Sequence, residues 1–242
     1  MDTSRKQSGS SSSLRQILNA WANKVGLVPT DQFHDVYGLD DELLSMVPQP
    51  VKAVVLLFPI RGPLEGMRRQ ENEKITTEGQ TPIDPTIIWV KQTISNACGT
   101  MGLLHALANS NVTIKPESPL SQFIDECKNK TPLERSKLLE ETPLFAAVHE
   151  EFASSGQSAV PENLDVDLHF TCFVQASAAS ARAAETETME MRLIELDGTR
   201  NGPIDRGTCT NLLKDAATYV KEKMIPNVPS AQFSMMALAA VL

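Results

Sequence analysis

The chain has 242 residues, of which 41% are hydrophobic and 21% are charged, and its formal net charge at pH 7 is −8. This length and hydrophobic fraction suffice for one sizeable core, so we expect one main domain. The negative charge argues against a surface for nucleic acid or for an anionic membrane, and it favours a basic partner.

The N-terminal residues and the cysteines set limits on location and chemistry. Residues 1–13 are rich in Ser and lack the apolar stretch of a signal peptide, and the longest apolar run, near residues 51–60, is too short to span a bilayer. The four cysteines form no Cys-x-x-Cys pair, so the spacing of a zinc site is missing. We therefore expect a disordered tail over residues 1–13 and a soluble, intracellular domain with reduced thiols over residues 14–242.

The first third of the chain predicts helices around one strand. Apolar residues recur at helical spacing over residues 14–25, so we expect an amphipathic helix that Gly26 ends. An extended piece and a short helix opened by Asp40 or Asp41 follow. The run "VKAVVLLFPI" is β-branched and almost wholly apolar, which predicts a strand buried on both faces. The segment "GPLEGMRRQENEKITTEGQ" is charged, partly helical in character and predicted to have low burial.

The rest of the chain mixes helices with strands. We expect a helix over about residues 97–108, and "PLSQFIDECKNK" and "TPLERSKLLEE" predict two more, each with an N-terminal Ser or Thr and a Pro. An exposed loop follows near residues 150–165. "DLHFTCFVQ" alternates as a half-buried strand, and "MEMRLIELDGTRNGPID" gives its hairpin partner, with the Ala-rich residues 176–188 inserted between them. A helix over about residues 209–224 and the strand "AQFSMMALAAV" complete an α+β pattern with a largely antiparallel sheet.

Cys98 is the first candidate for chemistry, because it lies where a predicted helix begins. Ser95 or Asn96 can cap that helix, and its free backbone N–H groups and positive dipole end favour a thiolate over a thiol. The same N–H groups can bind a developing oxyanion, and Gln92 offers a second donor from the preceding loop. A lone cysteine is more often a small core residue, so a structural role for Cys98 stays open at this point.

A thiolate also needs a base that can later protonate the leaving amine, and imidazole is the usual choice. His169 lies on the predicted strand, on the face opposite its apolar neighbours. Asp197 ends the next strand, where hairpin pairing can bring it beside the imidazole. Cys98, Gln92, His169 and Asp197 together supply the roles of a cysteine protease. The other three cysteines, and His105, fit roles in the core.

The segment "QTISNACGTMGLLHALAN" resembles the active-site segment of the ubiquitin C-terminal hydrolases, papain-like cysteine peptidases that remove adducts from the C-terminus of ubiquitin. The segments "FHDVYGLDDELLSMVPQPVKAVVLLFPI", "QENEKI", "VDLHFTCFV" and "LIELDGTRNGPI" recur in the family's order. The resemblance covers about residues 19–242 and is closest to the short, single-domain L3-type members. It implies a papain-like α-β-α arrangement with a largely antiparallel central sheet flanked by helices.

The resemblance also implies a role for each candidate residue. Cys98 would be the nucleophile, His169 the general base and acid, Asp197 the group that orients the imidazole, and Gln92 the oxyanion-hole side chain beside the backbone N–H of Cys98. No metal and no organic cofactor are required. The loop near residues 150–165 corresponds to the family's crossover loop, which admits only small or unfolded leaving groups.

The partner that the resemblance implies is ubiquitin, with Nedd8 as a second candidate. The acidic chain suits the basic tail of ubiquitin, since opposite charge speeds the encounter. We expect a cytoplasmic and also nuclear monomer without nucleic-acid or membrane contacts. The sequence departs from the family at "SGSSSSLRQIL", where a Trp-x-Pro-Leu-Glu-like segment is usual, and in the insertion over residues 176–188.

We therefore expect a deubiquitinating thiol hydrolase. One alternative is a module of the same fold that binds ubiquitin without turnover, which would follow if the changed N-terminus misaligned the cleft. A second alternative is a general papain-like peptidase, which would need an open cleft. The presence of all four catalytic residue types argues against the first, and the predicted loop over the site argues against the second.

Overall fold

The computed structural model describes residues 4–60, 62–94, 97–142, 168–178, 190–228 and 233–241, with side chains described from residue 14 onward. The α-helices are α1 (Ser4–Val25), α2 (Asp41–Leu44), α3 (Pro63–Glu78), α4 (Cys98–Ala108), α5 (Pro119–Cys127), α6 (Pro132–Glu141) and α9 (Leu212–Tyr219), which a π-turn and a 3-10 turn extend to Asn227. The strands are β1 (Asp31–Val36), β2 (Val51–Pro59), β3 (Leu168–Ser177), β4 (Met191–Leu196), β5 (Ile204–Thr208) and β6 (Ser234–Ala240).

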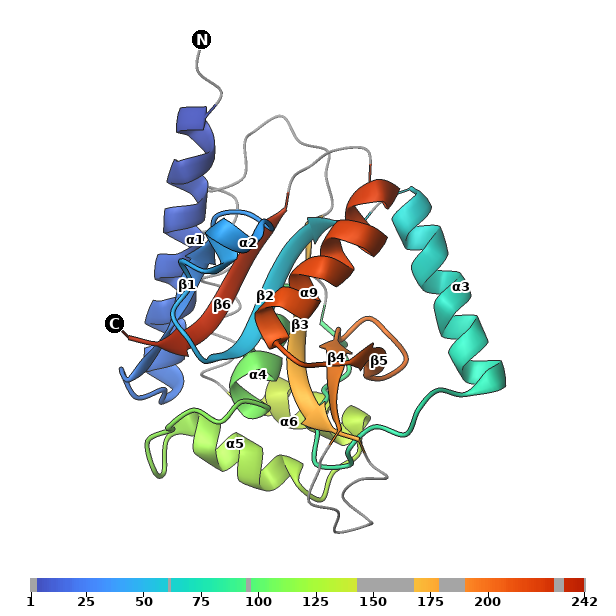
Figure 1. Cartoon of the computed structure of the whole chain (residues 1–242). Coiled ribbons are helices and arrows are strands. Elements are labelled where there is room, and N and C mark those ends of the chain that lie inside the picture. The colour runs from blue at the N-terminus through green and yellow to red at the C-terminus, as the bar shows by residue number, and fades with distance from the viewer. Residues whose placement is uncertain are drawn as a thin grey trace.

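The strands form one sheet in the order β1-β6-β2-β3-β4-β5, and every neighbouring pair is antiparallel (Figure 1). The predicted α+β class and the largely antiparallel sheet are therefore confirmed. The last strand, β6, lies between the first two strands, β1 and β2, so strands from the beginning and the end of the chain pair within one sheet (Figure 1). The strands β3 and β4 form the predicted hairpin, with Cys172 opposite Leu196.

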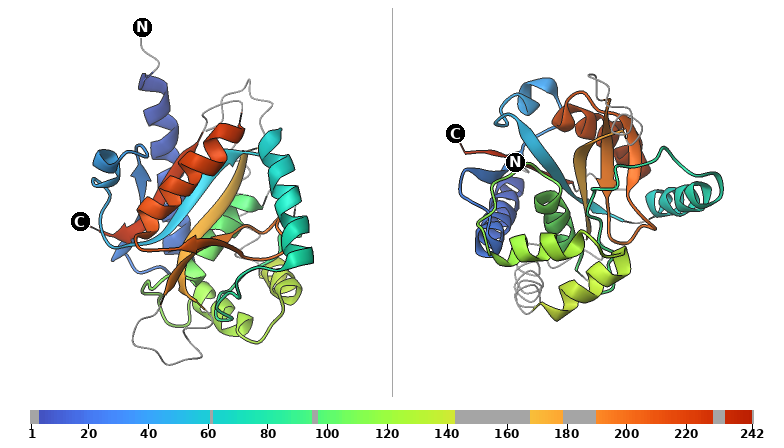
Figure 2. Two further views of the ribbon diagram at one scale, coloured as in Figure 1. Left: turned by 45° about the vertical axis from the view of Figure 1, so that its right-hand side comes forward. Right: turned by 90° about the horizontal axis from the view of Figure 1, so that it is seen from below.

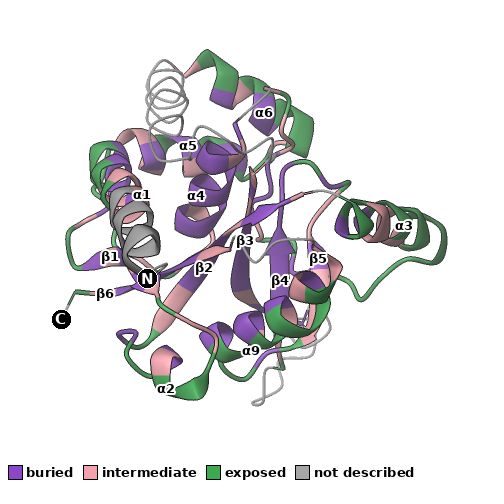
Figure 3. Cartoon of the chain, turned by 90° about the horizontal axis from the view of Figure 1, so that it is seen from above, coloured by how far each residue is buried: buried purple, intermediate pink, exposed green. Residues whose placement is uncertain are grey.

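Helices cover both faces of the sheet, as the α-β-α arrangement requires (Figures 2 and 3). On one face, α1, α4, α5 and α6 pack in a core that includes Val55, Cys172 and Leu196. On the other face, α2, α3 and α9 pack against Leu56 and Phe173. The strand β2 is buried on both faces, as its continuous apolar sequence predicts, because its alternate side chains enter the two cores.

Several helix boundaries follow from capping residues that the sequence shows. The side chain of Ser118 accepts a hydrogen bond at the start of α5, and Thr131 and Glu134 form a capping box at the start of α6. The proposed caps of α4, Ser95 and Asn96, lie outside the described residues. So do the predicted loop at residues 150–165 and most of the insertion at residues 176–188.

Three elements differ from their predicted bounds. The helix α1 begins at Ser4 rather than at residue 14, within the segment for which we expect a disordered tail. The strand β5 was not predicted, because its sequence "IDRGT" has almost no apolar side chains. The last helix begins at Leu212 rather than Cys209, because Asn211 caps it while Cys209 still pairs by its backbone with Met191.

No helix of the described ranges is both long enough and apolar enough to cross a membrane.

Candidate active site

Cys98 is the first residue of α4, where backbone N–H groups lack partners within the helix. The helix is almost wholly buried beneath the sheet, whereas the Cys98 side chain is only partly buried. The first turn of α4 contains no acidic side chain. Nothing in this turn therefore opposes a negative charge on sulfur, and the helix dipole favours one.

The strand β3 brings His169 to the same place. His169 is its second residue and lies opposite Phe58 of β2, whose ring contacts the imidazole edge-on at 5.6 Å between centroids. The helix α4 packs closely on this part of β3 because residue 102 is Gly. A Cβ atom at Gly102 would lie 3.3 Å from the Cβ of Phe170, the neighbour of His169.

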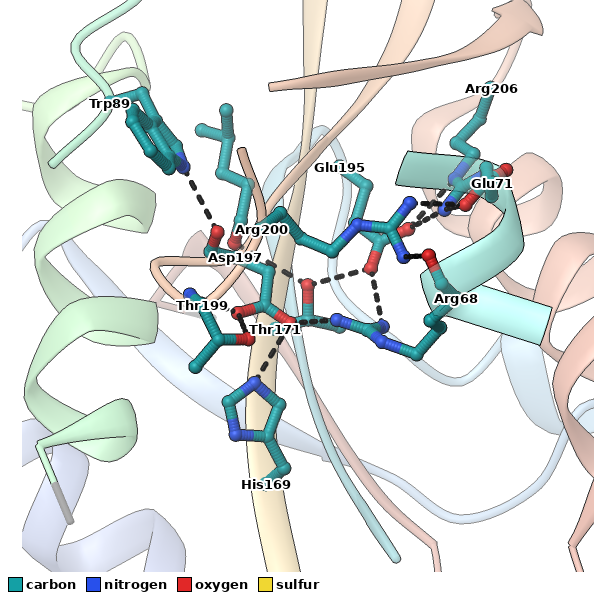
Figure 4. A network of polar contacts seen from close by, with 11 residues as sticks. Arg68, Glu71, Trp89, His169, Thr171, Glu195, Asp197, Thr199, Arg200 and Arg206 are labelled. Carbon is teal, nitrogen blue, oxygen red and sulfur yellow. Dashed lines mark hydrogen bonds and ion pairs between the residues drawn. The ribbon is translucent and has the colours of Figure 1, made fainter. Parts of the chain in front are cut away.

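Asp197 directly follows β4 and points its carboxylate at His169. Its Oδ2 lies 2.8 Å from Nε2 of His169. Its Oδ1 accepts hydrogen bonds from the backbone N–H and the hydroxyl of Thr199, each at 2.8 Å, and its carbonyl oxygen accepts one from the indole of Trp89 (Figure 4). The Asp197 residue is 1% exposed, so its orientation is fixed by these donors and by packing.

The Cys98 side chain lies near enough to His169 to favour the charged form of the imidazole, so the sulfur and the Asp197 carboxylate both act on the same ring. Since Nε2 binds Asp197, Nδ1 is the ring nitrogen left for the sulfur. Burial opposes a charge on the ring, but Asp197 and Cys98 outweigh it and raise the pKa of His169 to about 9. The imidazolium is therefore the favoured form at neutral pH, as a thiolate partner requires.

Gln92 lies in the irregular segment between α3 and α4, and the turn after Asp197 holds it there. Its backbone N–H donates to the carbonyl of Gly198 at 2.8 Å. Its side-chain Nε2 donates to the carbonyl of Ile94 at 3.0 Å, and its Oε1 is buried. The structure thus brings Cys98, His169 and Asp197 together, and it ties Gln92 to them through the backbone of the Asp197 turn.

A buried network of charges behind Asp197 was not predicted from the sequence (Figure 4). The guanidinium of Arg68 donates to Oδ2 of Asp197 and, at 3.1 Å, to Oε1 of Glu195. Arg68 lies in the segment for which low burial was predicted, and it is only 6% exposed. A signal was present, since Arg68 follows the buried Leu64 by four residues and so lies on the same helix face.

The network continues from Glu195 around a closed ring. Arg206 binds Glu195 and Glu71, Glu71 also binds Arg200, and Arg200 donates at 3.2 Å to the backbone carbonyl of Arg68. Burial alone would raise the pKa values of these carboxyl groups. The neighbouring arginines outweigh it, so they lower the pKa of Glu195 to about 2 and hold that of Asp197 well below its ordinary value.

His105 lies on α4 two turns after Cys98 and packs internally, as predicted. Its Nε2 accepts a hydrogen bond from the backbone N–H of Val90 at 3.0 Å, two residues before Gln92. Burial lowers the pKa of His105 to about 4, so the ring is neutral at pH 7. His105 therefore links the helix of the candidate nucleophile to the segment that carries Gln92.

The other three cysteines are buried, as predicted, and burial raises their thiol pKa values, for Cys127 to about 11 and for Cys209 to about 12. Among the described residues, Cys98 is the cysteine that lies both beside an imidazole and at a helix start. Among the residues described here, no group of three or more His, Cys, Asp and Glu is arranged to hold a metal ion.

Comparisons with known proteins show the family of this chain. The family model "Ubiquitin carboxyl-terminal hydrolase, family 1" matches residues 12–225. Ubiquitin carboxyl-terminal hydrolase 3 of Arabidopsis thaliana is 36% identical over 228 residues, which cover 92% of this chain and 90% of the relative. The human ubiquitin carboxyl-terminal hydrolase isozyme L1 is 34% identical over 227 residues, which cover 92% of this chain and 94% of the relative.

A solved structure, the UCH37 catalytic domain of Trichinella spiralis bound to ubiquitin vinyl methyl ester, matches with a TM-score of 0.66 and covers 94% of this chain and 93% of that chain. Its sequence identity of 20% supports the fold alone. The family model and the relatives confirm the resemblance that the motifs indicate. The chain belongs to the ubiquitin carboxyl-terminal hydrolases, family 1, and is a cysteine-type ubiquitinyl hydrolase.

Proposed function

We propose that this protein removes small or unfolded adducts from the C-terminal glycine of ubiquitin by means of a Cys98–His169–Asp197 triad. The observation that carries the proposal is the position of His169, which lies 2.8 Å from the Asp197 carboxylate and near enough to Cys98 for the sulfur to favour the imidazolium. This is the order of nucleophile, base and orienting group that acyl transfer by a thiol requires.

In the proposed reaction, the Cys98 thiolate attacks the carbonyl carbon of the terminal glycine. The carbonyl oxygen becomes an oxyanion, which the backbone N–H of Cys98 and the Gln92 amide stabilise. The imidazolium of His169 gives its proton to the leaving amine as the bond between carbon and nitrogen breaks. His169 then takes a proton from water, and the resulting hydroxide attacks the carbonyl carbon of the thioester. The bond between carbon and sulfur breaks, which restores the Cys98 thiolate and releases ubiquitin with a free C-terminal carboxyl group.

Two features of the site support these roles. Gln92 has an amide that donates to the carbonyl of Ile94 next to it, so a rotation of the side chain can redirect the donor to an oxyanion. The Asp197 carboxylate is surrounded by donors on both oxygens, which fixes the ring orientation of His169 through the catalytic cycle.

Ubiquitin as partner is supported by the names of the relatives and by the matching structure with a bound ubiquitin ester. The net charge of −8 suits a basic ligand surface. Nedd8 is proposed as a second ligand. The restriction to small or unfolded adducts rests on the family's crossover loop, whose counterpart near residues 150–165 lies outside the described residues.

The test uses ubiquitin and Nedd8 that carry a fluorogenic C-terminal amide, with casein as a general substrate. We expect release from ubiquitin and no digestion of casein, and release from the Nedd8 substrate decides whether Nedd8 is a second ligand. The variant Cys98→Ala removes the activity, whereas Cys209→Ala, a change at a buried cysteine of the other core, retains it. Ubiquitin binding without release by the unmodified protein would contradict the proposal and support a binding module, and casein digestion would support an open peptidase.

The size limit is tested by two fusions to the C-terminus of ubiquitin, a short unstructured peptide and a stably folded domain. We expect cleavage of the peptide fusion only. Equal cleavage of both fusions would contradict the proposed restriction while leaving the triad in place.

A further inference from the structure

Arg68 and His169 share one oxygen atom. The Oδ2 of Asp197 lies 2.8 Å from Nε2 of His169 and also accepts a hydrogen bond from the guanidinium of Arg68 (Figure 4). The second arm of the guanidinium binds Glu195 at 3.1 Å, so the planar fork of Arg68 spans two buried carboxylates. A positive charge thus lies against the same carboxylate that stabilises the imidazolium.

The ring of ion pairs fixes Arg68 in this position. Its guanidinium is held by Glu195, its backbone carbonyl accepts from Arg200, and its guanidinium carbon lies over the ring of Phe58, 5.3 Å from the centroid. Just after α3, the side chain of Gln80 donates to the carbonyl of Pro203, the residue before β5, and accepts from the N–H of Asp205 in β5. The helix α3 is therefore tied to the sheet at Arg68 and again just beyond its last turn.

We propose that Arg68 is a positioning residue for the hydrolase reaction, which holds the Asp197 carboxylate through Oδ2 and limits how tightly His169 binds its proton. The inference rests on the proposed triad. Part of the negative charge on Asp197 is neutralised by Arg68 and only the remainder acts on His169. The imidazolium consequently stays acidic enough to protonate the leaving amine.

The other charged or titratable groups around this centre favour the imidazolium, are uncharged or are balanced by partners. Cys98 on α4 and Asp197 after β4 favour the imidazolium, while His105 on α4 is neutral. Glu195 on β4 faces Arg68 and also Arg206 of β5. Tyr219 at the end of α9 stacks on Arg206 at 4.5 Å, and burial raises the pKa of this phenol, so it is uncharged. Arg68 is the cation whose hydrogen bond reaches the oxygen that His169 uses.

The experiment compares three variants of one helix. Arg68→Gln removes the charge, Arg68→Lys keeps the charge but cannot span both carboxylates, and Arg69→Gln changes an exposed arginine next to it. The titration of His169 is followed by NMR through its carbon-bound ring protons and assigned with a His169→Asn variant, since the chain has four histidines. The kcat and KM for the fluorogenic ubiquitin amide are measured beside it.

For Arg68→Gln we expect the titration midpoint of His169 to move upward by about one pH unit, because a nearby like charge is lost. We expect kcat/KM to fall by on the order of a hundredfold, because the carboxylate loses the donor that orients it. For Arg68→Lys the midpoint stays near that of the unmodified protein while kcat falls and KM is retained. Arg69→Gln changes neither quantity.

A His169 midpoint that stays in place or moves downward in a folded Arg68→Gln protein overturns the inference. If Arg68→Gln does not fold, Arg68→Lys decides, and full kcat in that variant overturns it as well. A purely structural role would change melting temperature without moving the midpoint. Activity that survives in His169→Asn would instead refute the triad itself, so the two failures are distinguishable.

Discussion

The Oδ1 of Asp197 accepts hydrogen bonds from both the backbone N–H and the hydroxyl of Thr199, each at 2.8 Å. The other oxygen of the carboxylate faces His169 and Arg68. Four groups therefore surround the carboxylate: the N–H and the hydroxyl of Thr199, the guanidinium of Arg68 and the imidazole of His169. Each donates to a carboxylate oxygen or lies within hydrogen-bond distance of one. An amide cannot satisfy such a site, because wherever its NH₂ group points it meets another donor.

The first prediction concerns Asp197→Asn. Asp197 raises the pKa of His169, so its neutralisation lowers that pKa from about 9 and moves the alkaline limb of the kcat/KM profile to lower pH. Because the amide also misorients the imidazole, we expect kcat/KM to fall by about 10³- to 10⁴-fold. The measurement is a pH profile on the ubiquitin amide, with Asp205→Asn as control, since Asp205 pairs with Arg192 away from the triad. An alkaline limb that stays at its original pH would contradict the assigned role.

The second prediction concerns Gly198, the residue that joins the Asp197 turn to Gln92. A Cβ atom at Gly198 would lie 2.9 Å from the Cβ of Gln92 and 3.1 Å from its backbone nitrogen. The variant Gly198→Ala must therefore displace the Gln92 segment, and we expect kcat to fall by on the order of a hundredfold with the fold retained. The stability cost should be about 1–3 kcal/mol.

The matched control for this change is Gly202→Ala, where a Cβ atom would meet nothing within 4 Å. It should keep kcat and change the free energy of unfolding by less than about 0.5 kcal/mol. Full activity of Gly198→Ala would show that the position of Gln92 does not matter for turnover.

The third prediction concerns the buried His105. Its pKa is lowered from 6.5 to about 4, so between these pH values the unfolded chain binds a proton that the native state does not. The native protein should therefore lose about 2 kcal/mol of stability through this residue as the pH falls from 7.5 to 5.

The variant His105→Leu isolates this effect. At pH 7.5 it should be less stable than the unmodified protein by about 1–3 kcal/mol, because the N–H of Val90 loses its acceptor. At pH 5 the gap should narrow by about 2 kcal/mol, since leucine cannot titrate. Urea unfolding at pH 7.5 and pH 5 measures the free energy of unfolding of both proteins. A difference in stability that does not change with pH would show that His105 binds its proton in the native state as readily as in the unfolded chain.

Much of the fold could be predicted from local patterns. The continuous apolar run of β2, the alternation of β3 and the Ser and Thr caps of α5 and α6 each carry their own signal, because short-range sterics and capping decide these elements. The strand β5 carries none, since it is mostly polar and is formed through its pairing with β4. Its position depends on partners distant in sequence rather than on its own residues.

The same distinction holds for the site. The positions of Cys98 and His169 follow from a helix start and a strand, and Asp197 follows from the hairpin that ends at its turn. Arg68 could not be placed, because an arginine on a charged helix is normally solvated. Its charge is balanced in the buried site by Glu195 and Asp197, which are more than a hundred residues later in the sequence.

The most direct test of the account is covalent capture of the nucleophile. The full chain is incubated with ubiquitin vinyl methyl ester, and the product is examined by intact mass and by peptide mapping. The account predicts one ubiquitin per chain, attached to the sulfur of Cys98, and a strongly reduced rate of capture in His169→Asn. Attachment at Cys127, Cys172 or Cys209, or complete resistance of a folded protein to the ester, would contradict it.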